Sequence, residues 1–440
     1  MTELAGFSFA SLQFTREGVI HDQPEMDALL GLLEQEHVTD LFAVSHGWNN
    51  DMADARELYA ALFQSVHARL DAGQFEALAA RRFAVLGIFW PSKQFADSEL
   101  SPGGAASVGS VVSDEILRRQ IGDLRGVFSA PGADDKLMKA RGLIGRLDDS
   151  PAARAEFADL VRSILPRAAA NDEDASDRFF HIDGDQLMRR LSQPILPAPP
   201  RRGSSGGASS VGGGPRGGSA GFELSLSGMK AAARRLLNYA TYYQMKERAG
   251  TVGEAGVNQA LRSVRESQPG VRIHLVGHSF GGRLVTAAIS GPRNLGPIGV
   301  STLTLLQAAY SHNGLAERYD GTHEGVFRRV VSDGMVSGPT MITCTSNDIA
   351  VGQAYPIASR IANQAASALG DKDDLYGGMG RNGAQHTPEA VETELLPVPS
   401  AYHLEAGKIY NLHGDAFISH HGDVTGPEVA QAILAAVAVT

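Results

Sequence analysis

The chain has 440 residues, of which 43% are hydrophobic and 20% are charged, and its formal net charge is −10 at pH 7. This length is sufficient for one large core and for two or three domains, and the negative charge argues against nucleic-acid binding, which usually needs a basic surface. The single cysteine, Cys344, excludes an internal disulfide and a metal site made of several cysteines. We therefore expect neither a metal nor a cofactor.

The start of the chain and its apolar runs predict a protein without stable membrane insertion. Met1–Leu4 does not begin a basic segment followed by an apolar one, the pattern of a signal peptide. No run of about 18 apolar residues is present to cross a bilayer. We expect a cytoplasmic protein, and the oligomeric state stays open.

In the two outer parts of the chain, short apolar runs alternate with helical patterns. Strands are expected at 41–45, 83–89, 272–276, 302–306, 341–345 and 408–412, and helices at 24–36, 52–70, 251–268, 280–289 and 354–369. Thr251-Val252-Gly253-Glu254 has the form of a capping box and predicts that the third helix begins there. Near-continuous apolar strands that alternate with helices predict an α/β fold with a mostly parallel central sheet and helices on both faces.

The part of the chain between these regions has a different character. Residues 200–221 read PRRGSSGGASSVGGGPRGGSAG, which holds too little apolar surface to offset its ordering entropy and predicts a flexible linker. Ser150-Pro151 is typical of an N-cap followed by proline in the first helical turn. A helical stripe follows it: Phe157, Leu160, Val161, Ile164 and Leu165. We predict an α/β core from 1–96 and 250–440, interrupted by a largely helical insertion or cap at 97–249.

The pattern Gly-x-Ser-x-Gly occurs around three serines. Ser205 and Ser219 lie in the Gly/Ser-rich linker, where the pattern reflects composition. The third, Gly277-His278-Ser279-Phe280-Gly281, lies between an expected strand and an expected helix. A tight strand-to-helix turn exposes its central side chain and needs small neighbours, and a helix N-terminus favours a developing oxyanion. Ser279 is therefore the candidate nucleophile.

This segment resembles the nucleophile elbow of the α/β-hydrolase superfamily, in the His-Ser-Phe-Gly-Gly form of lipases and esterases. The resemblance covers about 1–96 and 250–440. It implies an α/β-hydrolase fold and a serine hydrolase whose acid and histidine follow the serine in the chain.

The resemblance implies that the acid follows the second strand after the elbow. Asp348 lies just after the expected strand 341–345 and is the candidate. A turn-capping role is the alternative for this residue. Asp333 is a weaker rival for the acid, because no convincing strand leads into it.

Three histidines follow the last expected strand. The run Ser419-His420-His421-Gly422-Asp423-Val424 resembles the terminal histidine loop of the family, and it favours His421 over His420 as the base. His413 is expected to be structural. The catalytic set that the resemblance implies is therefore Ser279, Asp348 and His421.

The family's oxyanion hole uses two backbone N–H groups, one from the residue after the nucleophile. That residue is Phe280, and the loop His46-Gly47-Trp48 after the expected strand 41–45 would supply Trp48 as the second donor. The alternative is that His46-Gly47 is a simple turn and Trp48 a core residue. We expect four residues near the substrate pocket: His46, Gly47, Trp90 and His278.

The expected reaction is acyl transfer to Ser279 and then to water, with a small-molecule or lipid ester as substrate. Peptidases, amidases and thioesterases use the same residues and stay open. A non-catalytic interaction protein on a hydrolase scaffold and an effector that acts on membrane lipid are further alternatives. We expect the insertion to cover the cleft, with a second rim formed by 371–401.

Overall fold

The computed structural model describes residues 2–48, 50–92, 113–167, 173–193, 228–348, 350–351, 357–358, 361–362 and 372–440. The chain divides into two compact units. The first, called here the sheet unit, comprises Met1–Lys93, Met245–Val351 and Gly378–Thr440, and the second, the helical unit, comprises Gln94–Gln244 and Gly352–Gly377. Residues 352–377, which the sequence assigns to the core, thus belong to the helical unit. The linker 200–221 and most of the helix expected at 354–369 lie outside the described residues.

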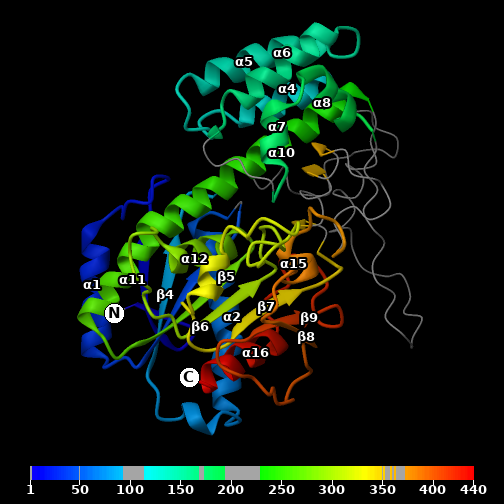
Figure 1. Ribbon diagram of the computed structural model, residues 1–440. Helices are drawn as coiled ribbons and strands as arrows, with labels where there is room; N and C mark the ends of the chain where they lie inside the picture. Colours follow the sequence, from blue (N-terminus) through cyan, green and yellow to red (C-terminus); the bar gives the residue numbers. More distant parts are fainter. Residues whose placement is uncertain are drawn as a thin grey trace, which may run out of the picture. The chain divides into compact units, whose positions relative to one another are not determined.

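The described strands of the sheet unit form one nine-stranded sheet (Figure 1). Its order is β1-β2-β4-β3-β5-β6-β7-β9-β8, and only β1 is antiparallel to its neighbour. The strands are β1 Thr2–Leu4, β2 Phe7–Gln13, β3 Asp40–Ser45, β4 Phe83–Phe89, β5 Arg272–His278, β6 Thr302–Leu306, β7 Thr340–Cys344, β8 Ala390–Glu394 and β9 Ile409–His413. The α/β class with a mostly parallel sheet is confirmed.

The six expected strands agree with the structure to within two residues at each end. The sequence did not predict β1, β2 and β8. β8 reads AVETE and is half-buried or exposed along its whole length, so it lacks the apolar run that identifies an inner parallel strand. β1 has only three residues.

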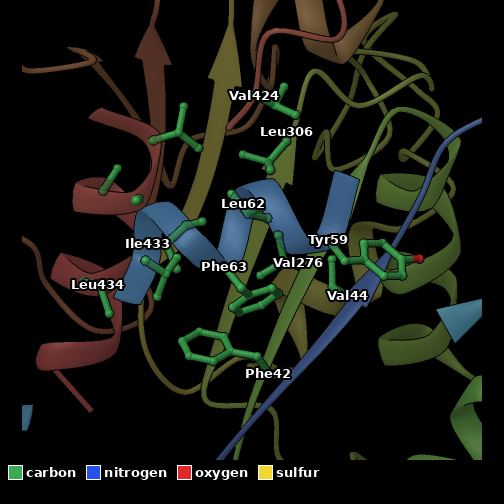
Figure 2. Packing of buried hydrophobic residues seen from close by; sticks show 14 of the residues in the cluster. Phe42, Val44, Tyr59, Leu62, Phe63, Val276, Leu306, Val424, Ile433 and Leu434 are labelled. Carbon is green, nitrogen blue, oxygen red and sulfur yellow. The ribbon is translucent and has the colours of Figure 1, made fainter. Parts of the chain in front are cut away.

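Helices cover both faces of this sheet. On one face α2 (Met52–Asp71) packs against α16 (Pro427–Ala438) over a continuous apolar core (Figure 2). Phe42 and Val44 of β3 point into this core together with Phe63 of α2. Because alternate strand residues face opposite sides, the other face is left for α1 (Gln23–Gln35), α11 (Asn258–Ser267) and α12 (Phe280–Ser290).

The prediction of a capping box and a helix start at Thr251 is wrong. Helix α10 (Met229–Thr251) continues through a π-helical turn, Val252–Val257, directly into α11, and the Thr251 side chain makes no capping hydrogen bond. The glycines serve close packing instead. A Cβ at Gly253 would lie 2.1 Å from the Leu284 carbonyl oxygen, and one at Gly256 would lie 2.3 Å from that of Gly18.

The described part of the helical unit contains α4 (Asp114–Asp123), α5 (Ala133–Leu143), α6 (Pro151–Arg162), α7 (Ser176–His181), α8 (Gly184–Leu191) and the first part of α10. The expected N-cap of α6 is confirmed, because the Ser150 hydroxyl accepts a hydrogen bond from the Ala153 N–H at 3.2 Å. Helix α6 packs against both α5 and α8. Among the described residues, none of the helices combines the length and apolar character needed to span a membrane.

Candidate active site

The connections between the strands diverge at the carboxyl ends of β3 and β5. From β3 the chain passes through α2 to β4 on one side, and from β5 it passes through α12 to β6 on the other. Ligands of open α/β sheets bind at such a point, where neighbouring connections diverge. Ser45 is opposite Gly277 in the sheet, so the loop after β3 lies beside the turn after β5. These segments carry His46-Gly47-Trp48 and His278-Ser279-Phe280.

Ser279 occupies the strained turn between β5 and α12. Its φ of 58° and ψ of −123° are rarely adopted by residues other than glycine. The end of β6 holds this turn, since the Ser279 N–H donates to the Leu306 carbonyl (3.0 Å) and the Ser279 carbonyl accepts from the Ala309 N–H (2.9 Å). A Cβ at Gly281 would lie 2.2 Å from the Ser45 carbonyl oxygen. Glycine is therefore required at position 281, because the chain there lies in close contact with β3.

The structure brings Asp348 and His421 together. The His421 Nδ1 donates to Asp348 Oδ2 at 2.8 Å, and the other carboxylate oxygen accepts from the Val351 N–H at 2.9 Å. Asp348 is fully buried and follows β7, whereas His421 follows β9. These strands are neighbours, with Cys344 opposite His413. The acid and the histidine thus come from adjacent loops at the same edge of the sheet as Ser279.

The environment of His421 favours its protonated form. Burial alone lowers the pKa of this imidazole, but the negative charge of Asp348 and the hydrogen bond to it outweigh burial and raise the pKa above its ordinary value. His421 can therefore bind a proton while Asp348 fixes the ring with Nδ1 protonated and Nε2 turned away from the carboxylate.

The two loops that carry Asp348 and His421 are joined by hydrogen bonds that sequence reasoning missed. Asp415 accepts from the Thr345 hydroxyl and from the Ser346 N–H, both at 2.8 Å. The Asn347 side-chain amide donates to the Ile418 carbonyl at 2.8 Å. The position of Asp415, two residues after β9, was the available signal for a polar residue at this edge of the sheet.

The rival residues of the sequence analysis have other partners. His420 Nδ1 accepts from the Gly422 N–H at 3.1 Å. His413 contacts Glu392 at 2.5 Å and the Cys344 sulfur at 3.6 Å. Asp333 accepts from Arg329 at 3.0 Å. His421 is thus the histidine of this group that is bonded to Asp348.

His278 links the Ser279 turn to the His421 loop. Its Nε2 donates to the His421 carbonyl oxygen at 2.9 Å, and the two rings lie with centroids 4.9 Å apart. Among the residues that the structure describes, no hydrogen bond joins Ser279 Oγ to the His421 ring. Such bonds are often long without substrate and tighten in the reacting complex.

The loop after β3 packs directly on Ser279. A Cβ at Gly47 would lie 2.6 Å from Ser279 Cβ and 3.1 Å from its Oγ, so only glycine fits at this contact. The Trp48 ring is half-buried and meets the Phe280 ring edge to face at 6.2 Å. Phe280 begins α12, where the helix presents its positive end. Trp48, in the loop after β3, and Phe280, at the start of α12, therefore flank Ser279.

His46 and Trp90 support this loop from within the core. His46 Nε2 accepts from the Trp90 backbone N–H (3.3 Å), which leaves Nδ1 as the protonated nitrogen that donates to the Gly47 carbonyl (2.9 Å). The rings of His46 and Trp90 stack at 5.6 Å, and both residues are buried. Burial lowers the pKa of His46 to about 4. In a trans peptide the Trp48 N–H points away from the Gly47 carbonyl oxygen, so His46 fixes the direction of that N–H.

In the ranges that the structure describes, no three His, Cys, Asp or Glu side chains are grouped so as to hold a metal ion. A scan against protein-family models and searches of curated proteins and of solved structures found no match to this chain.

Proposed function

We propose that this chain is a serine hydrolase with an α/β-hydrolase fold that cleaves carboxylic ester bonds through an acyl-enzyme on Ser279. The observation that carries the proposal is the 2.8 Å hydrogen bond between His421 and the buried Asp348, in loops that meet the strained Ser279 turn. A serine, a histidine and a carboxylate in this relation are the parts required for nucleophilic acyl transfer.

In the proposed reaction, Ser279 Oγ attacks the ester carbonyl carbon while His421 Nε2 takes its proton. The negative charge on the carbonyl oxygen is stabilised by the backbone N–H groups of Trp48 and Phe280, and Asp348 stabilises the charged imidazole. His421 then gives its proton to the departing alkoxide, which leaves as the alcohol. Water attacks the acyl-enzyme with His421 again as base, and the acid is released.

The substrate class follows from the resemblance to esterases and lipases, and a small-molecule or lipid ester is the proposed substrate. The same residues serve peptidases, amidases and thioesterases. Parallel assays with a p-nitrophenyl ester, the matching anilide and a thioester of one acyl chain would separate these classes. A series of ester chain lengths, with and without residues 97–225, would test the helical insertion as a cover of the cleft.

The proposal is tested by labelling the folded protein with a fluorophosphonate probe. We expect labelling of the wild type and none of Ser279→Ala. Ser205→Ala and Ser219→Ala are matched controls, because these serines have the same five-residue pattern, and both should keep full labelling. Absence of labelling in the folded wild type, together with no turnover of any p-nitrophenyl ester, would contradict the proposal and favour the non-catalytic alternative.

A further inference from the structure

His278 connects two parts of the candidate site that are separated in the sheet. It is the last residue of β5 and is opposite Leu306 of β6. His421 follows β9, and β6 and β7 lie between β5 and β9. The His278 side chain bridges this distance and donates from Nε2 to the His421 backbone carbonyl at 2.9 Å.

The protonation state of His278 follows from its contacts. Because Nε2 faces a carbonyl oxygen, this nitrogen carries the hydrogen. Nδ1 is buried and has no hydrogen-bond partner in the described residues. Burial, and then the nearby charge of His421, lower the pKa of His278 to about 3. His278 is therefore a neutral donor over the whole range in which His421 titrates, and it does not compete with it for the proton.

We propose that His278 is a positioning residue that fixes the backbone of His421 against the nucleophile turn. The inference rests on the proposed function, since it concerns the alignment of the proposed base. Asp348 fixes the His421 ring at Nδ1, and His278 fixes the carbonyl of the same residue. Because both the ring and the backbone carbonyl of His421 are held, His278 at the end of β5 determines where His421 Nε2 lies relative to Ser279.

The alignment of His421 with Ser279 depends on the His278 hydrogen bond because Asp348 holds only the His421 ring. The Asp348 and His421 loops are anchored to each other by Asp415 and Asn347. The His278 hydrogen bond connects the His421 backbone directly to the end of β5. A displacement of about 1 Å at a reacting group can cost about 10²-fold in rate, so loss of the donor should affect kcat more than KM.

The test compares two substitutions at one position. Glutamine has its Nε2 three bonds from Cβ, as histidine does, so His278→Gln keeps a donor for the His421 carbonyl. His278→Leu removes the donor and puts an apolar side chain in its place. His21→Leu, an exposed histidine beside β2, is the control. For each variant we would measure kcat and KM for p-nitrophenyl butyrate against pH, the melting temperature, and hydrogen–deuterium exchange of the peptide that contains 419–424.

We expect His278→Leu to lower kcat by about 10- to 100-fold with little change in KM, and His278→Gln to stay within about threefold of the wild type. The midpoint of the acid limb should be the same in all variants, because Asp348 and burial set the pKa of His421. Exchange at 419–424 should rise in His278→Leu alone.

Wild-type kcat in folded His278→Leu, or an equal loss in His278→Gln and His278→Leu, would overturn the inference. Loss of the acid limb in His278→Gln would also overturn it, since His278 itself would then be the base. An inactive, unlabelled wild type would instead refute the proposed function. In that case the exchange experiment still decides whether His278 holds the loop.

Discussion

Replacement of Gly47 by alanine is the sharpest single test of how the loop after β3 meets Ser279, the proposed nucleophile. The added Cβ would lie 2.6 Å from Ser279 Cβ and 3.1 Å from Ser279 Oγ. Carbon atoms in contact are normally about 3.5–4.0 Å apart, so the loop or the nucleophile must move by about 1 Å. Ser279 is held through the Leu306 and Ala309 hydrogen bonds, and the loop is held through His46.

The expected cost is larger in activity than in stability. A displacement of about 1 Å at the reacting atoms corresponds to about a 10²-fold loss in rate. Overpacking of a close contact typically costs about 1–3 kcal/mol in the free energy of unfolding. We therefore expect Gly47→Ala to fold and to lose about 10²-fold or more in kcat/KM for p-nitrophenyl acetate, with slower labelling by the fluorophosphonate.

Gly31→Ala is the matched control. Gly31 lies inside α1, where a Cβ would meet only the end of the flexible Gln35 side chain at 3.8 Å. This variant should keep wild-type activity and gain up to about 1 kcal/mol of stability from helix propensity. Wild-type kcat/KM in folded Gly47→Ala would refute the packing of this loop on Ser279.

Three further predictions address the histidines and the core. The pKa of His421 is raised, and the proposed base must be neutral to accept a proton, so kcat/KM should fall as the pH drops through a midpoint above about 6.5. Asp348→Asn should move this midpoint to lower pH and reduce kcat by about 10⁴-fold. His46→Asn keeps a donor two bonds from Cβ and should retain most of kcat, whereas His46→Leu should lose about 10-fold or more, up to the 10²–10³-fold of a lost oxyanion donor. Asp40 is buried between His274 and Arg81, each at 3.0 Å, so Asp40→Ala should lower the free energy of unfolding by about 3–5 kcal/mol in urea titrations at pH 7, with unchanged turnover per folded molecule. Burial alone raises the pKa of Asp40, but His274, Thr39 and Arg81 lower it overall; the stabilisation is therefore present above the unfolded pKa of about 3.9 and lost as the pH falls through the lower folded value.

The sequence predicted the inner part of the sheet because buried parallel strands must be apolar on both faces. Strands such as β3 and β5 are buried along nearly their whole length and are visible as apolar runs. Edge strands carry no such constraint, and β8 was missed for that reason. The capping box at Thr251 failed for another reason, because local pattern cannot show that Gly253 and Gly256 are needed against Leu284 and Gly18.

The candidate site, like the sheet, has features that the sequence predicts and features that it does not. Ser279, Asp348 and His421 were identified by their order and by their places after expected strands, and the structure places Asp348 and His421 within hydrogen-bond distance. His46 and Trp90, which the sequence places near the substrate pocket as an expectation, are buried and bonded to each other. A motif gives the residue type at a turn. It does not give the direction of the side chain, which depends on partners that are 44 positions away for His46 and 143 for His278.

Three histidines near Ser279 illustrate what decides the identity of the proposed base. Burial by itself lowers the pKa of all three. The resulting pKa is about 4 for His46 and about 3 for His278. His421 differs because a carboxylate faces its Nδ1, whereas the other two donate to neutral carbonyl groups. A charged partner stabilises the imidazolium, but a peptide carbonyl does not offset desolvation. The position of Asp348, more than the position of any histidine in the sequence, therefore determines which of the three can carry a proton in the reaction.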